Sequence, residues 1–126
     1  MQTDDRERRS RIRQSLDRLA REIQGLLPVF TDRGPMLKGT VYAQRRKCGK
    51  PRCGCASGEP HGTMMLSRSE EGRTTLVAIP DGYLKEWQVL TRRYQRFRRA
   101  RARLGQIYKT MLSLLDQLEA ARRREP

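Results

Sequence analysis

The three cysteines and the one histidine of this 126-residue chain lie in a single short segment, and this clustering constrains the fold more than any other feature. The segment reads KCGKPRCGCASGEPHG, and its metal-binding side chains are Cys48, Cys53, Cys55 and His61. Zinc in structural sites is held tetrahedrally by Cys and His, and three thiolates with one imidazole complete that shell. We therefore predict a structural zinc site. A disulfide with one spare thiol, reactive cysteines, and iron–sulfur ligation are the alternatives.

Composition explains why such a site would matter for folding. Hydrophobic residues make up 36% of the chain and charged residues 33%, so the apolar core is expected to be thin. Thin cores are commonly supplemented by a metal, by disulfides or by oligomerisation. We expect metal binding to be coupled to folding of the middle of the chain.

The chain is strongly basic, with 28 Lys and Arg against 14 Asp and Glu and a formal net charge of +14. Such a charge predicts a polyanionic partner, of which nucleic acid is the usual one and an anionic membrane surface the other. The polar N-terminus predicts no signal peptide, and no stretch is long and apolar enough to span a membrane. Because the number of cysteines is also odd, we expect a cytoplasmic protein in a reducing compartment.

Hydrophobic periodicity predicts an α+β fold in three consecutive parts, residues 1–30, 31–80 and 81–126. The first part is predicted as a helix over residues 4–27 that Pro28 ends. Its apolar stripe consists of Ile12, Leu16, Leu19, Ile23 and Leu26.

The middle part is predicted as a three-stranded antiparallel sheet, stapled by zinc, with strands over residues 37–46, 62–69 and 73–80. Gly72 suits a position of positive φ in the second turn. The third part is predicted as one helix over residues 82–123.

This long helix has an apolar stripe spaced alternately by four and three residues, which is typical of a coiled-coil seam and is interrupted at Arg101. The N-terminal helix can cover about half of a helix that extends roughly 60 Å. We therefore predict a homodimer through the rest of the seam. The alternative is a helix bent at Gly105 that folds back within one chain. The stripe consists of Tyr83, Trp87, Leu90, Tyr94, Phe97, Arg101, Leu104, Tyr108, Met111, Leu115 and Leu118.

Two clusters of basic residues indicate where a polyanion would bind. The run RRYQRFRRARAR over residues 92–103 has seven arginines and no acid. Its main arginine stripe, Arg92, Arg96, Arg99 and Arg103, is expected to lie opposite the apolar seam. Arginine favours bidentate contacts with phosphate. We predict nucleic-acid binding, with DNA favoured over RNA, and membrane or acidic-protein binding as alternatives. The predicted residues are Arg45, Arg46, Lys47, Lys50, Arg52, Arg92, Arg93, Arg96, Arg99 and Arg103.

We do not expect an enzyme. The only histidine is assigned to the metal, and a closed four-ligand zinc site leaves no position for a catalytic water. The sequence has no phosphate-cradling P-loop.

The segment KCGKPRCGCASGEPHG, followed by a short hairpin, the dipeptide IP and a long basic helix, resembles a family of small, poorly characterised bacterial and archaeal proteins with a CGKP-x-C-x-C…HG core. The resemblance covers roughly residues 38–100, with the N-terminal helix outside it. It implies that Cys48, Cys53, Cys55 and His61 are metal ligands, and that the protein assists a transposase or recombinase of a mobile element. The chain departs from the family at residues 63–65, where Thr, Met and Met replace aromatic residues.

Overall fold

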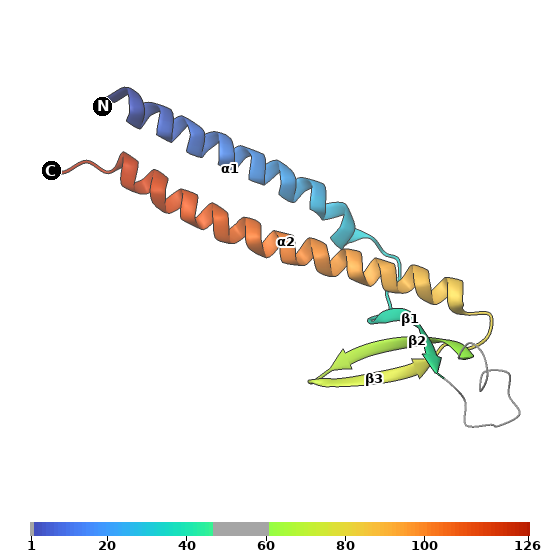
Figure 1. The fold of residues 1–126 in the computed structure, drawn as a ribbon. Helices are drawn as coiled ribbons and strands as arrows, with labels where there is room; N and C mark the ends of the chain where they lie inside the picture. The colour runs from blue at the N-terminus through green and yellow to red at the C-terminus, as the bar shows by residue number, and fades with distance from the viewer. Residues whose placement is uncertain (1, 47–60) are drawn as a thin grey trace, which may run out of the picture. The chain divides into compact units, whose positions relative to one another are not determined.

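The computed structural model describes residues 2–46 and 61–126, and these form an α+β fold in the order α1–β1–β2–β3–α2 (Figure 1). The predicted fold class, an N-terminal helix, a three-stranded antiparallel sheet and a long C-terminal helix, is confirmed. The chain divides into two compact units. Residues 1–33 and 96–126 form one, called the helical unit, and residues 34–95 form the other, called the sheet unit. Helix α2 therefore contributes to both.

Helix α1 runs from Gln2 to Thr31, so the prediction that Pro28 ends it is wrong. Proline in a helix interior removes a backbone hydrogen bond and costs roughly 3 kcal/mol. Two contacts beyond the proline hold this last turn and offset part of the cost. The ring of Phe30 packs edge-on against the ring of Phe97 with 5.2 Å between centroids, and the Thr31 hydroxyl donates a 3.1 Å hydrogen bond to the carbonyl of Leu27.

Helix α2 runs from Leu84 to Arg122, close to the predicted 82–123. Its first turn is joined to the preceding turn by hydrogen bonds from the Tyr83 amide to the Pro80 carbonyl and from the Trp87 amide to the Tyr83 carbonyl, 3.1 and 2.9 Å long. Over the described ranges, neither helix combines the length and apolar character that a membrane span requires.

The part of α2 from Arg96 onward packs antiparallel to α1 (Figure 1), and the predicted seam of α1 is confirmed by the burial of Ile12 and Leu19. The predicted seam of α2 is wrong at every second residue after Phe97. At each of these positions the preceding residue in the sequence lies in the seam instead. Ile107 is 0% exposed, whereas Tyr108 is 54% exposed. The seam that is buried or half-buried has no charged residue and consists of Phe97, Ala100, Leu104, Ile107, Met111, Leu114, Leu118 and Ala121.

The sheet has strands β1 (Thr40–Arg46), β2 (His61–Glu70) and β3 (Arg73–Ala78) in the order β1-β2-β3, all antiparallel. Strands β2 and β3 are joined by a two-residue loop in which Glu71 and Gly72 have φ values of 52° and 78°. Positive φ at both central residues matches the type I′ turn, whose twist suits a hairpin. The predicted role of Gly72 is confirmed.

The part of the sheet around Leu66 is covered within the sheet unit by the first turns of α2. Leu66, in the central strand, is 1% exposed, and Thr91 of α2 is also buried. The connection before β1 is tied to α2 by a 3.1 Å hydrogen bond from the Leu37 amide to the Leu90 carbonyl. At Gly39, where φ is 138°, an added Cβ would lie 2.7 Å from Leu66 Cδ1, so glycine is required for this close approach.

The seam assignment can be tested by stability measurements. Replacing Ile107 with Ala removes a fully buried side chain, and we expect the free energy of unfolding to fall by about 3 kcal/mol. Gln106→Ala, at the neighbouring exposed position, should change it by less than about 0.5 kcal/mol. Denaturant titration followed by circular dichroism measures both, and similar effects of the two substitutions would contradict this seam.

Candidate nucleic-acid interface

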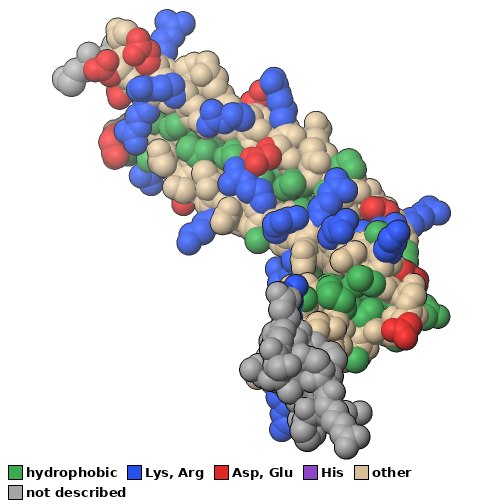
Figure 2. All heavy atoms as spheres, turned by 45° about the vertical axis from the view of Figure 1, so that its right-hand side comes forward, with side chains coloured by type: hydrophobic (Ala, Val, Ile, Leu, Met, Phe, Trp, Pro, Cys, Tyr) green, Lys and Arg blue, Asp and Glu red, His purple; other side chains and the backbone are tan. Residues whose placement is uncertain are grey.

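The helical unit exposes a group of four arginines on α2, Arg96, Arg98, Arg99 and Arg101, which we call the arginine cluster. All four side chains are exposed, and in the described part of the chain none forms an ion pair with a carboxylate. Figure 2 shows more Lys and Arg than Asp and Glu side chains on the face turned to the viewer. Four guanidinium groups within six residues give this stretch of α2 a dense positive charge, which at about 100° per residue is spread over the part of the helix outside the seam.

Arg103 differs from the cluster because it binds α1. Its Nε and Nη2 atoms each donate a 2.7 Å hydrogen bond to the Glu22 carboxylate. The hydrogen bond with Arg103 lowers the pKa of Glu22 below its ordinary value, and the same hydrogen bond raises the pKa of Arg103. The expectation that this residue lies opposite the buried seam is therefore wrong. Arg103 lies beside the seam, where side chains of paired helices meet.

The predicted nucleic-acid-binding residues do not include Arg98 and Arg101. The periodicity places Arg101 in the seam and Arg98 outside the predicted arginine stripe. The available signal was the complete absence of acidic residues from Trp87 to Leu115, which makes every arginine of that stretch a candidate.

The predicted basic residues of the sheet unit have different surroundings. Arg93 is exposed and donates a 3.3 Å hydrogen bond from Nη1 to the carbonyl of Pro35, so it also supports the connection before β1. Arg92 lines a hollow beside Thr91 and Gln95. Arg45 is exposed on β1, and Arg46 ends the strand. The predicted residues Lys47, Lys50 and Arg52 lie outside the described residues.

Three of the predicted zinc ligands, Cys48, Cys53 and Cys55, also lie outside the described residues. His61 begins β2, and its backbone is paired with Arg46 at the end of β1. This register places side by side Arg46 and His61, the two described residues that flank residues 47–60. Elsewhere in the described ranges, no three His, Cys, Asp or Glu side chains are grouped as metal ligands would be.

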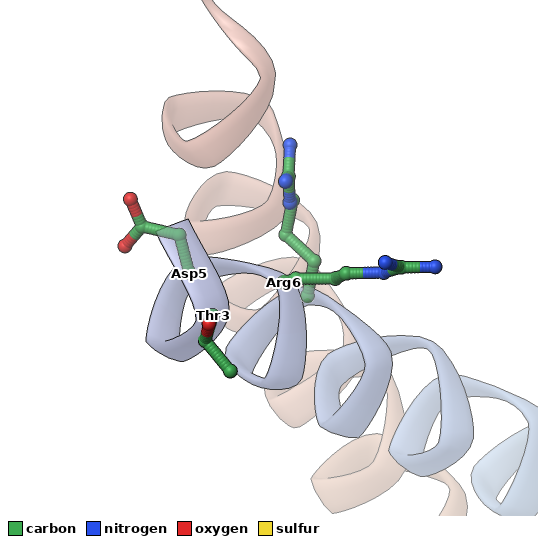
Figure 3. A pocket seen from close by; sticks show the side chains of 4 residues that line it. Thr3, Asp5 and Arg6 are labelled. Carbon is green, nitrogen blue, oxygen red and sulfur yellow. The ribbon is translucent and has the colours of Figure 1, made fainter. Parts of the chain in front are cut away.

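A hollow on the surface of α1 offers no reaction centre. It has a volume of about 470 Å³ and is lined by Thr3, Asp5, Arg6 and Arg9. Figure 3 shows that the Asp5 carboxylate and the Arg6 guanidinium point away from each other. These side chains come from the first turns of one helix and do not converge on a common point.

The ion pair between Glu22 and Arg103 predicts a pH-dependent contribution to stability. Because the pKa of Glu22 is lowered in the folded chain, the stabilisation is present above the ordinary pKa of 4.5 and is lost as the pH falls through the lowered value. We expect Glu22→Gln to lower the melting temperature slightly at pH 7, and the difference from the wild type to vanish in acid. Asp17→Asn, which breaks the more exposed pair with Arg21, should have a smaller effect; equal effects at all pH values would contradict this assignment.

No curated protein and no solved structure matches the chain. The sequence pattern of DUF6788, described as a domain of unknown function, matches residues 6–89. That range includes most of α1, so the expectation that the N-terminal helix lies outside the family resemblance is wrong. It also includes the whole cysteine segment and the sheet, and the chain belongs to the DUF6788 family.

Proposed function

We propose that the protein binds nucleic acid, with duplex DNA as the favoured ligand, through the phosphate backbone. The observation that carries this proposal is the arginine cluster, Arg96, Arg98, Arg99 and Arg101, whose four side chains are exposed and have no carboxylate partner in the described ranges. Arg103 and Arg21, on the same unit, do have such partners. A cation without an internal partner is free to replace the counterions of a polyanion.

The charge of the helical unit supports the same conclusion. This unit has 17 Lys and Arg against 9 Asp and Glu, and the excess lies mostly on α2. Each phosphate neutralised by Lys or Arg releases condensed counterions, which supplies affinity with little dependence on base sequence. We therefore propose a binding role in which the position on the nucleic acid is set by a partner. A transposase or recombinase is the partner that the family resemblance suggests.

The arginine cluster can be tested with a charge-matched control. If about six phosphates are neutralised, the logarithm of the association constant for a 20-base-pair duplex should fall with the logarithm of the salt concentration with a slope of about −5. Replacing Arg96, Arg98, Arg99 and Arg101 with Gln should reduce the slope to about −2 and weaken binding about a hundredfold or more at low salt. Fluorescence anisotropy at several salt concentrations measures both.

The control variant replaces Arg8, Arg11, Arg13 and Arg18 of α1 with Gln, which removes the same net charge from the other helix of the unit. It should retain most of the slope. Equal losses in the two variants would show a non-specific effect of net charge. Binding that is weak and insensitive to salt in the wild type would instead favour a protein adaptor with an acidic partner. Competition between duplex DNA and structured RNA separates these two ligands.

We further propose that a structural zinc ion supports the sheet unit. The donor set of Cys48, Cys53, Cys55 and His61 suits zinc. The pairing of Arg46 with His61 supports the proposal because it brings the two ends of the ligand segment together. The ion would order the segment that carries Lys47, Lys50 and Arg52 and so fix the position of these cations.

Removal of a ligand tests the zinc proposal separately from nucleic-acid binding. Cys53→Ala or His61→Ala should reduce zinc from about one equivalent per chain to nearly none. Ser57→Ala, in the same segment, should leave the zinc content unchanged. Elemental analysis of protein purified without added metal is the measurement, and a wild-type chain without zinc would contradict the proposal.

A further inference from the structure

Three large hydrophobic side chains of α2 remain exposed beside the seam with α1. Tyr108, Leu112 and Leu115 are 54%, 63% and 46% exposed. Their spacing of four and three residues aligns them along one helix face, and Glu119 and Arg122 continue it. A single exposed leucine is ordinary, whereas a contiguous apolar stripe indicates an interaction surface.

A hollow of about 400 Å³ adjoins the C-terminal end of this stripe. Four of the residues that line it, Leu115, Leu118, Glu119 and Arg122, stand at positions i, i+3, i+4 and i+7 of α2. This is the arrangement of four side chains that accepts a knob from a facing helix in a coiled coil. The stripe thus presents both knobs and a hole.

Gly105 lies on the same stripe, three residues before Tyr108. A Cβ added at this glycine would meet no atom within 4 Å. Packing within one chain therefore does not require glycine here, although glycine in a helix interior is unfavourable relative to alanine. The missing side chain leaves room for a side chain from another helix.

Charge indicates which helix could pack there. Between residues 105 and 122, α2 has two basic residues, Lys109 and Arg122, and two acidic residues, Asp116 and Glu119. An acidic partner would be attracted more strongly to the preceding arginine-rich stretch. A second copy of this basic chain can approach only where the local charge is balanced, and the stripe lies in that part of the helix.

We propose that two copies of this chain associate through the stripe, with the two α2 helices antiparallel about a two-fold axis. An alignment that sets Leu112 against Leu115 of the second copy also sets Tyr108 against Glu119 of the second copy. Each Tyr108 ring then fills the hollow of the other chain, with its hydroxyl near a carboxylate. The same alignment sets Arg122 over the space at Gly105.

The charges that flank the stripe select this alignment. It sets Lys109 opposite Asp116 of the second copy, twice by symmetry, and no described carboxylate or cation is paired with either residue within one chain. A shift by seven residues in either direction would set two Lys109 or two Asp116 side chains against each other. A parallel alignment would oppose two Glu119 side chains. Opposite charges beside a seam fix register and orientation in coiled coils.

The test is the association state of the full chain without nucleic acid, measured by analytical ultracentrifugation. The wild type should be a dimer at about 100 μM or below, and Leu112→Glu should raise the dissociation constant about 30-fold or more. The control, Leu76→Glu, changes a leucine of β3 that is 48% exposed and should leave the dimer intact. A wild type that stays monomeric at about 100 μM overturns the proposal and points to a different protein as the occupant. A dimer that tolerates Leu112→Glu overturns it as well.

Mixing two variants tests the alignment itself. Leu112→Glu and Leu115→Lys should each be monomeric alone and form a heterodimer when mixed, because the introduced glutamate and lysine face each other only in the proposed register. A mixture that stays monomeric overturns this register. Circular dichroism checks that both variants are folded.

Hydrogen exchange of the wild type tests the dimer without any substitution. The amides around residues 105–119 should become more protected from exchange as the protein concentration rises, and unchanged protection contradicts the proposal.

Discussion

The burial of Ile107 against α1 determines which surfaces of the helical unit are available. Consecutive residues of an α-helix are rotated by about 100°, so a fixed inward direction for one residue fixes the direction of all the others. Tyr108 follows Ile107 directly and is exposed. The position of Arg103 beside Glu22, the exposure of the arginine cluster and the second apolar stripe all follow from this one rotation of α2.

The sequence was sufficient for the type and order of the elements, because each has a strong periodic signal. The five residues of the α1 stripe allow only one helix face, and that face is the buried one. In α2 two registers compete after Phe97. The spacing 97-101-104-108 collects more large side chains, whereas 97-100-104-107 collects Ala100 and Ile107 and has no charge. The size of the side chains favours the first register, and packing against α1 selects the second.

The ends of elements depend on contacts between residues far apart in sequence, which periodicity does not report. Pro28 is a strong stop signal in isolation, yet α1 continues because Phe30 meets Phe97. Strand β1 begins at Thr40 and not at residue 37, because the amide of Leu37 is bonded to α2 and Gly39 adopts a positive φ. The candidate site was predictable to the same degree: the arginine-rich stretch was evident from sequence, but the pairing of Arg103 with Glu22 joins residues 81 positions apart.

The division of charge along α2 separates two kinds of contact on one helix. Arginine side chains without a partner in the chain stay hydrated and surrounded by counterions. A polyanion is the ligand that replaces this water and these counterions favourably. The balanced stretch beyond Gly105 has no such excess, so apolar burial there is not opposed by like-charge repulsion. A mixed distribution of the same residues would weaken both interactions, because acidic neighbours would neutralise the cluster and basic neighbours would repel a second copy. In the proposed function and the proposed dimer, the order of residues along α2 therefore matters more than the net charge of the chain, because it keeps the proposed phosphate-binding stretch apart from the proposed helix-pairing stretch.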